Sequence, residues 1–204
     1  MSAGHWFNDS YEGTSLAGPT TEKPRAEFQV EGELSPFEHE RIFQILKKRF
    51  RVSEPSYLDL PDENLVTRVS ITFYHPYDLS FFSEILTDGW RDLKGILKEI
   101  RHRRGGAGAA FNLIFTHEKT RLIFKTGLLD SEQNDSALDQ VGHLTSIVAK
   151  TTQSLNLNVP IDRFECTFDG KTDRWNDFRA FPGSADRSFR FDDEKSVWTS
   201  FQWA

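Results

Sequence analysis

Two histidines, a tyrosine and two acidic residues lie where predicted strands of this chain end. His75, Tyr77 and Asp78 follow one predicted strand, and His117 and Glu118 lie at the tip of a predicted hairpin. Imidazole and carboxylate groups bind divalent metals and act as general acids and bases. Because their spacing matches no known motif, a purely structural role is the alternative to a metal or acid–base site. In that alternative Asp78 caps a helix, His75 shapes a turn and His117 is solvated.

A basic cluster, Arg101-His102-Arg103-Arg104, leads directly into a glycine-rich segment at residues 105–108. Glycine loops that bind phosphate run from a strand into a helix, so that the helix amides point at the phosphate. Here the order is helix, loop and strand, which places the cluster at the negative end of a helix dipole. We therefore favour a capping role with Gly105 as the left-handed cap, and keep anion binding by Arg103 and Arg104 as the alternative.

The outward positions of the predicted strands also collect positive charge. They include Arg68, Arg121, Lys125 and Arg163, with Tyr74 as an aromatic neighbour. RNA-recognition modules use such a face, but their glycine–aromatic signature is absent from the strand at 121–125. The chain carries 25 Lys and Arg against 31 Asp and Glu, a net charge of −6. This balance argues against nucleic acid as a partner, and anion binding by the face remains an alternative.

The single cysteine, Cys166, excludes an internal disulfide and a cysteine cluster for zinc. It lies between Phe164 and Phe168 on the core side of a predicted strand, so we expect a buried and inert thiol. We find no nucleophile elbow, phosphate loop or cysteine pair, and we predict no cofactor and no metal. No leader segment is recognisable, and no run approaches the roughly 20 apolar residues of a membrane helix. We expect a cytoplasmic protein without a membrane partner.

Hydrophobic periodicity divides residues 65–168 into six elements. Alternating strands are predicted near 66–74, 111–116, 121–125 and 163–168, and helices with an apolar stripe over 82–104 and from 135 or 136 to 155. The order β-α-β-β-α-β is that of the ferredoxin-like split βαβ fold. We therefore predict an α+β protein with an antiparallel sheet in the strand order 4-1-3-2 and both helices on one face.

The segments before this core are predicted to differ from one another. Residues 1–33 are polar and lack a sustained period, so we expect a mobile arm. Ser35-Pro36-Phe37-Glu38 combines an N-cap, a proline at the first helical position and a capping-box glutamate. Residues 34–64 should therefore form an N-terminal helix, ending near Arg51, and a loop.

The last segment, residues 169–204, is rich in aromatic residues. Exposing one large apolar side chain costs about 1.5–3 kcal/mol, so we expect the segment to pack. Residues 189–191 and 197–203 alternate like strands, with a hairpin turn at 192–195. The possible acceptors are the second face or the edge of the sheet, or another subunit. Its candidate interaction residues are Trp175, Trp198 and Trp203.

These patterns favour a non-enzymatic binding or protein-interaction module whose partner is another protein or a second copy. One alternative is an enzyme or small-ligand binder at His75, Asp78 and His117. Another is an anion-binding or nucleic-acid-binding protein that uses the basic face and the loop at 101–108. The position of residues 169–204 is decisive, because a covered sheet face offers no binding platform and an uncovered face does.

Overall fold

The computed structural model describes residues 22–53, 57–58, 66–155, 160–183 and 187–201. The strands are β1 (Arg25–Glu31), β2 (Arg51–Ser53), β3 (Tyr57–Leu58), β4 (Thr67–Phe73), β5 (Ala109–His117), β6 (Thr120–Lys125), β7 (Ile161–Asp169), β8 (Arg174–Pro182), β9 (Ser188–Asp192) and β10 (Val197–Phe201). The helices are α1 (Pro36–Lys47), α2 (Thr87–Arg104), α3 (Ser131–Val141) and α4 (Thr145–Gln153), with a π-helical turn, η1 (Phe81–Ile85), before α2 and a 3-10 turn, η2 (Gly105–Ala107), after it.

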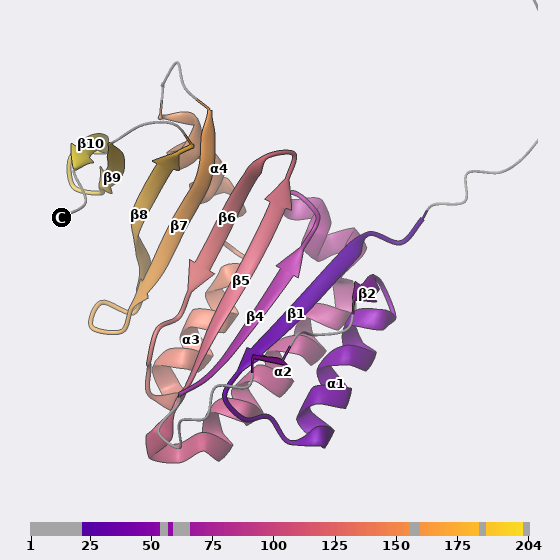
Figure 1. Cartoon of the computed structure of the whole chain (residues 1–204). Helices are drawn as coiled ribbons and strands as arrows, with labels where there is room; N and C mark the ends of the chain where they lie inside the picture. The colour runs from indigo at the N-terminus through magenta and orange to yellow at the C-terminus, as the bar shows by residue number, and fades with distance from the viewer. Residues whose placement is uncertain (1–21, 54–56, 59–65, 156–159, 184–186, 202–204) are drawn as a thin grey trace, which may run out of the picture.

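All these strands join one mixed sheet in the order β10-β9-β8-β7-β6-β5-β4-β1-β2, and β3 pairs with β1. Figure 1 shows α1, α2 and α3 on the same side of this sheet. The protein is therefore of the α+β type, as expected.

The ferredoxin-like arrangement is not confirmed. Strands and helices follow one another as predicted from β4 to β7, but these strands pair in chain order, β4-β5-β6-β7. The pair β4–β5 is parallel, β5–β6 is antiparallel and β6–β7 is parallel. In the predicted order 4-1-3-2 each helical crossover skips one strand, whereas here each connects neighbours. Alternation of apolar residues identifies the buried face of a strand but not its neighbours, so the sequence pattern fits both orders.

β1 lies inside the sheet, between β2 and β4, although a mobile arm was predicted there. Ala26, Phe28 and Val30 are buried and alternate with polar residues, and the strand pairs antiparallel with β4. The prediction was wrong for residues 25–31 because it weighed the polar composition above a short period of two. Residues 1–21 of the predicted arm lie outside the described residues.

α1 begins as predicted, because both bonds of the capping box are formed. The Ser35 hydroxyl accepts from the Glu38 amide at 3.2 Å, and the Glu38 carboxylate accepts from the Ser35 amide at 2.9 Å. Pro36 opens the helix. The helix ends at Lys47 rather than near Arg51, which begins β2.

The predicted helix at 135–155 is two helices, α3 and α4, with Gly142 as the C-cap of the first. The N-cap of α3 is Asp130, whose carboxylate accepts from the Gln133 amide at 2.8 Å. The predicted N-cap residues, Asp135 and Ser136, lie inside α3. The earlier capping box had the stronger local signal, because Gln133 also returns a bond to the Asp130 amide.

A continuous series of aromatic rings fills the space between the sheet and the helices. Phe81, supplied by η1, lies 4.9 Å from both Phe73 of β4 and Phe115 of β5. Tyr77 extends the series from Phe115 to Phe124 of β6, at 4.9 and 4.8 Å. These edge and tilted contacts each add about 0.5–1.5 kcal/mol beyond area burial.

The aromatic C-terminal segment extends the edge of the sheet instead of covering its second face. β8 pairs antiparallel with β7, β9 with β8, and β10 with β9. Trp175 and Phe178 are buried in the helix-facing core, and the Trp175 ring lies 5.2 Å from Phe124. β9, β10 and the turn between them agree with the prediction, whereas β8 was not predicted.

Replacing Trp175 with alanine should lower the free energy of unfolding by about 3–5 kcal/mol. Its ring is 7% exposed, and its indole donates to the Ala137 carbonyl of α3 at 2.9 Å. Urea unfolding followed by circular dichroism measures the change. Phe37→Ala is the control, because Phe37 is 57% exposed and should cost less than about 1 kcal/mol. Equal losses for the two variants would contradict the packing of β8 into the core.

Candidate functional site

The face of the sheet opposite the helices is the candidate site, and we call it the open face. A row of paired residues crosses it from β1 to β10: Glu27, Thr72, Ile114, Ile123, Glu165, Arg179, Arg190 and Thr199. Ile114 and Ile123 are only half-buried. In Figure 1 no described helix lies over this face. An uncovered sheet face is the condition for a binding platform.

At the β1 end of the open face, the predicted anion-binding Arg68 is held by Glu31 at 2.6 Å. At the opposite end of the β1–β4 pair, the Arg25 guanidinium lies 4.6 Å from the centre of the Tyr74 ring. The Tyr74 hydroxyl donates to Glu27 at 2.9 Å. Desolvation of the ring, together with this bond and the Glu27 charge, raises the pKa of Tyr74. This end therefore combines charges that are already compensated.

At the centre of the open face, two predicted anion-binding residues share one carboxylate. Lys125 and Arg163 lie 2.8 and 3.1 Å from the oxygens of Glu165, whose side chain is only 11% exposed. The Arg163 guanidinium also stacks 4.2 Å from the Phe181 ring centre. Arg121 is exposed and lies opposite Arg163 across the β6–β7 pair. The structure thus brings Arg121, Lys125 and Arg163 together, with Glu165 between the latter two.

At the β8 end, Asp177 links two arginines. Its carboxylate lies 2.6 Å from Arg179 and 2.7 Å from Arg190 of β9. Asp177 has a φ of +52°, at the point where the register of β8 against β7 shifts. Such a bulge re-aims a side chain, and here it places the carboxylate between the two guanidiniums.

Below this bulge β9 separates from β8, and a cleft of about 630 Å³ opens. It is lined by Thr167, Phe168, Asp169, Asn176, Asp177, Arg190, Phe191, Asp192, Asp193 and Thr199. Burial, with the charges of Asp192 and Asp177, raises the pKa of Asp193. The pKa of Asp192 is lowered, chiefly because its carboxylate accepts from the Lys195 amide. The sequence pattern at 192–195 predicts only a turn and does not indicate this cleft.

The predicted edge residues lie at one end of the sheet. β4 and β5 are parallel and end there, and the Thr120 hydroxyl of the hairpin tip donates to the Ile161 carbonyl at 2.8 Å. Residues 156–159, predicted to share this edge, lie outside the described residues. Within the described chain, no three His, Cys, Asp or Glu side chains form a group that could hold a metal.

The edge residues Tyr77, Asp78 and His75 each contact another group of the chain. Tyr77 is buried in the aromatic core and donates its hydroxyl to the Val141 carbonyl, and burial raises its pKa. Asp78 accepts from the Phe81 amide at 3.0 Å, and this is the capping role weighed for it. His75 contacts the carbonyl of Pro76 at 2.9 Å.

The hairpin residues His117 and Glu118 are exposed at the tip. The side chain of His117 is 63% exposed and lies 4.0 Å from that of Glu118, which has a φ of +53° in the two-residue turn. Their exposure agrees with the solvated interpretation of His117.

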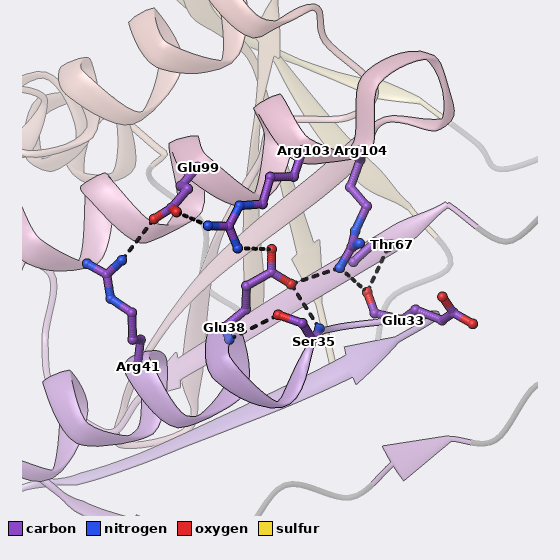
Figure 2. A network of polar contacts seen from close by, with 8 residues as sticks. All are labelled: Glu33, Ser35, Glu38, Arg41, Thr67, Glu99, Arg103 and Arg104. Atoms are coloured by element: carbon purple, nitrogen blue, oxygen red, sulfur yellow. Dashed lines mark hydrogen bonds and ion pairs between the residues drawn. The ribbon is translucent and has the colours of Figure 1, made fainter.

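Arg103 and Arg104, the candidate anion-binding residues of the glycine-rich loop, hold α1 against α2. Figure 2 shows both guanidiniums directed at Glu38. Arg104 lies 2.9 Å and Arg103 3.6 Å from its carboxylate oxygens. The Glu38 side chain is 1% exposed. The sequence predicts Glu38 as a capping residue but does not indicate its second role as the partner of Arg103 and Arg104.

The pKa of Glu38 shows the same arrangement. Burial alone would raise it, but hydrogen bonds from Ser35 and the charges of Arg104 and Arg103 outweigh burial and lower the pKa below 4.5. Arg104 also donates to the Glu33 carbonyl at 2.7 Å, and Gly105 is the C-cap of α2 with a φ of +50°. The cluster therefore joins three segments of the fold.

The candidate interaction tryptophans anchor the C-terminal strands. Trp198 of β10 donates to the Thr151 carbonyl and the Ser154 hydroxyl, both at 3.1 Å, and its ring lies 5.3 Å from Phe191. The half-buried Trp198 thus ties β10 to the end of α4, and Trp175 is buried. Trp203 lies outside the described residues.

No protein-family model, curated protein or solved structure matches the chain. Among the helices that the structure describes, none is long and apolar enough to span a membrane.

Glu38→Gln should lower the free energy of unfolding at pH 7 by about 1–3 kcal/mol, because Arg103 and Arg104 lose a buried charged partner. The difference from wild type should shrink as the pH falls below 4.5. A carboxyl whose pKa is lowered by folding stabilises the fold above its unfolded pKa and loses that contribution as it is protonated. Urea unfolding between pH 7 and pH 3 measures both effects.

The matched control is Glu40→Gln, which changes the same charge at an exposed position of α1. It should leave the unfolding free energy within about 0.5 kcal/mol of wild type. A pH-independent difference for Glu38→Gln would contradict the charged network.

Proposed function

We propose that this chain is a non-enzymatic protein-interaction module that self-associates through the uncovered part of its sheet. The observation that carries the proposal is the course of β8, β9 and β10. These strands continue the sheet beyond β7, so they leave both the open face and a terminal strand edge accessible. Large, accessible sheet surfaces of this kind are a common means of pairing one protein with another.

The charge pattern supports a protein partner over a phosphate backbone. Arg68, Lys125, Arg163, Arg179 and Arg190 all lie within 3.1 Å of a carboxylate of the chain itself. Phosphate binding would require these cations to exchange their partners, in a protein of net charge −6. Anion binding therefore remains an alternative, and it would depend mainly on Arg121, which is exposed.

The catalytic alternative depends on the edge residues. Asp78 and Tyr77 already use their oxygen atoms in hydrogen bonds to the Phe81 amide and the Val141 carbonyl, so a substrate would have to displace those contacts first. A cytoplasmic location is part of the proposal, because the single cysteine, Cys166, is free, whereas oxidising compartments favour chains with disulfides.

Glu165→Gln should increase retention of the protein on a heparin column. The variant leaves Lys125 and Arg163 uncompensated next to Arg121, which creates a cationic patch on the open face. Wild type should elute at lower salt than the variant. Glu132→Gln, which removes the same charge from an exposed position of α3, should elute with wild type. Strong retention of wild type, equal to that of Glu165→Gln, would favour the anion-binding alternative.

The full-length chain should associate reversibly with itself. Sedimentation velocity and light scattering between about 1 µM and about 1 mM cover the range of weak protein complexes. We expect the average mass to rise from that of the 23.5 kDa chain toward twice that value. A constant monomer mass over the whole range would overturn the proposed function.

A further inference from the structure

We infer that β10 pairs antiparallel with β10 of a second copy, so that the two sheets join edge to edge about a two-fold axis. This inference rests on the proposed function and identifies its contact surface.

Among the strands that the structure describes, β10 is the last of the sheet, and β9 is its neighbour on the inner side. In a strand, the backbone N–H and C=O groups of alternate residues point to opposite sides. The outer side of β10 therefore presents backbone groups that a further strand can bind. Its sequence, Val197-Trp198-Thr199-Ser200-Phe201, contains no charged residue and no proline. Charges, prolines and bulges are the usual features that prevent edge pairing, and this strand has none of them.

The opposite edge of the sheet is less suitable. β2 has only three residues and β3 only two, and both pair with β1. Arg51, the first residue of β2, is exposed and forms an ion pair with Glu22. A partner strand could pair with only a few residues there and would lie next to the charged Arg51. β10 is therefore the edge that favours association.

β10 is self-complementary under two-fold symmetry. When the register is centred on Thr199, this residue faces its own copy, Trp198 faces Ser200, and Val197 faces Phe201. No like charges meet, and a large side chain faces a small one in the rung beside the axis. Val197, which is 46% exposed in the single chain, becomes covered by the partner. An isologous contact of this kind closes after two copies.

The edge is also held in place before any partner binds. Five residues of β10 are in register with β9, the turn is closed by the Lys195 amide donating to Asp192 at 3.1 Å, and Trp198 is bonded to α4. A second copy therefore meets an ordered strand and loses little conformational entropy.

The open face is the weaker choice for the same contact. Its carboxylates Glu165 and Asp177 are 11% and 17% exposed and each contacts two cations. Covering these groups with a second sheet would remove water from several ions, and that cost offsets the Coulombic gain. Edge pairing leaves them solvated.

The test replaces Thr199, an exposed residue, with lysine or glutamate. Each single variant puts two like charges directly opposite one another at the axis. Thr199→Lys and Thr199→Glu should sediment as monomers at concentrations where wild type is dimeric, and their equimolar mixture should recover a heterodimer. Thr116→Lys is the matched control, because Thr116 lies on the open face of the inner strand β5, and it should dimerise like wild type.

A second measurement does not depend on weakened association. Residues that face one another across antiparallel strands have Cα atoms about 4.5–5.5 Å apart, within the range that a disulfide spans. Thr199→Cys should therefore form a covalent dimer under mild oxidation, and Thr116→Cys should not. Cys166 is buried and should not compete.

The outcomes separate the two proposals. Dimerisation of the Thr199 charge variants at the wild-type concentration, with no disulfide from Thr199→Cys, would overturn edge pairing and leave the self-association of the chain intact. A wild-type chain that stays monomeric throughout would overturn both.

Discussion

The contact on which the structure depends is the series of aromatic rings between the sheet and its helices. It runs from Phe50, 5.4 Å from Phe73, through Phe81, Phe115, Tyr77 and Phe124 to Trp175 of β8. Because these large side chains must leave water, they fix which face of β4, β5, β6 and β8 is covered. The other face, with its paired charges, is left to solvent or to a partner as a direct consequence.

Several elements were predictable because their signals are local. The capping box at Ser35 and Glu38, the β5–β6 hairpin and the stripe of α2 each depend on residues a few positions apart. The order of strands was not, because the pairing of β4 with β5 is decided by contacts far apart in sequence. β1 was missed since seven alternating residues lie within a polar segment, and β8 since its alternation is broken by the bulge at Asp177.

For the candidate site residues too, the sequence predicts local features but not contacts between distant segments. Strand alternation placed Arg68, Lys125 and Arg163 on one face, but it did not show that Glu31 and Glu165 hold them. Likewise, Glu38 was recognisable as a cap, whereas its contact with Arg104 joins residues 66 positions apart. Charge neutralisation on a sheet depends on cross-strand neighbours, which only the register supplies. Trp198 was a candidate interaction residue of a segment expected to pack, and it fixes the strand that we propose as the interface to α4.

Hydrogen exchange of the β10 amides at two protein concentrations tests the central claim most directly. Edge amides exchange readily in a single chain, and a second strand would bond them. The account predicts that the outward-pointing amides of β10 gain protection at high concentration, while the amides of β5 and β6 exchange at the same rate in both samples. Unchanged exchange in β10 in a sample that is demonstrably dimeric would contradict it.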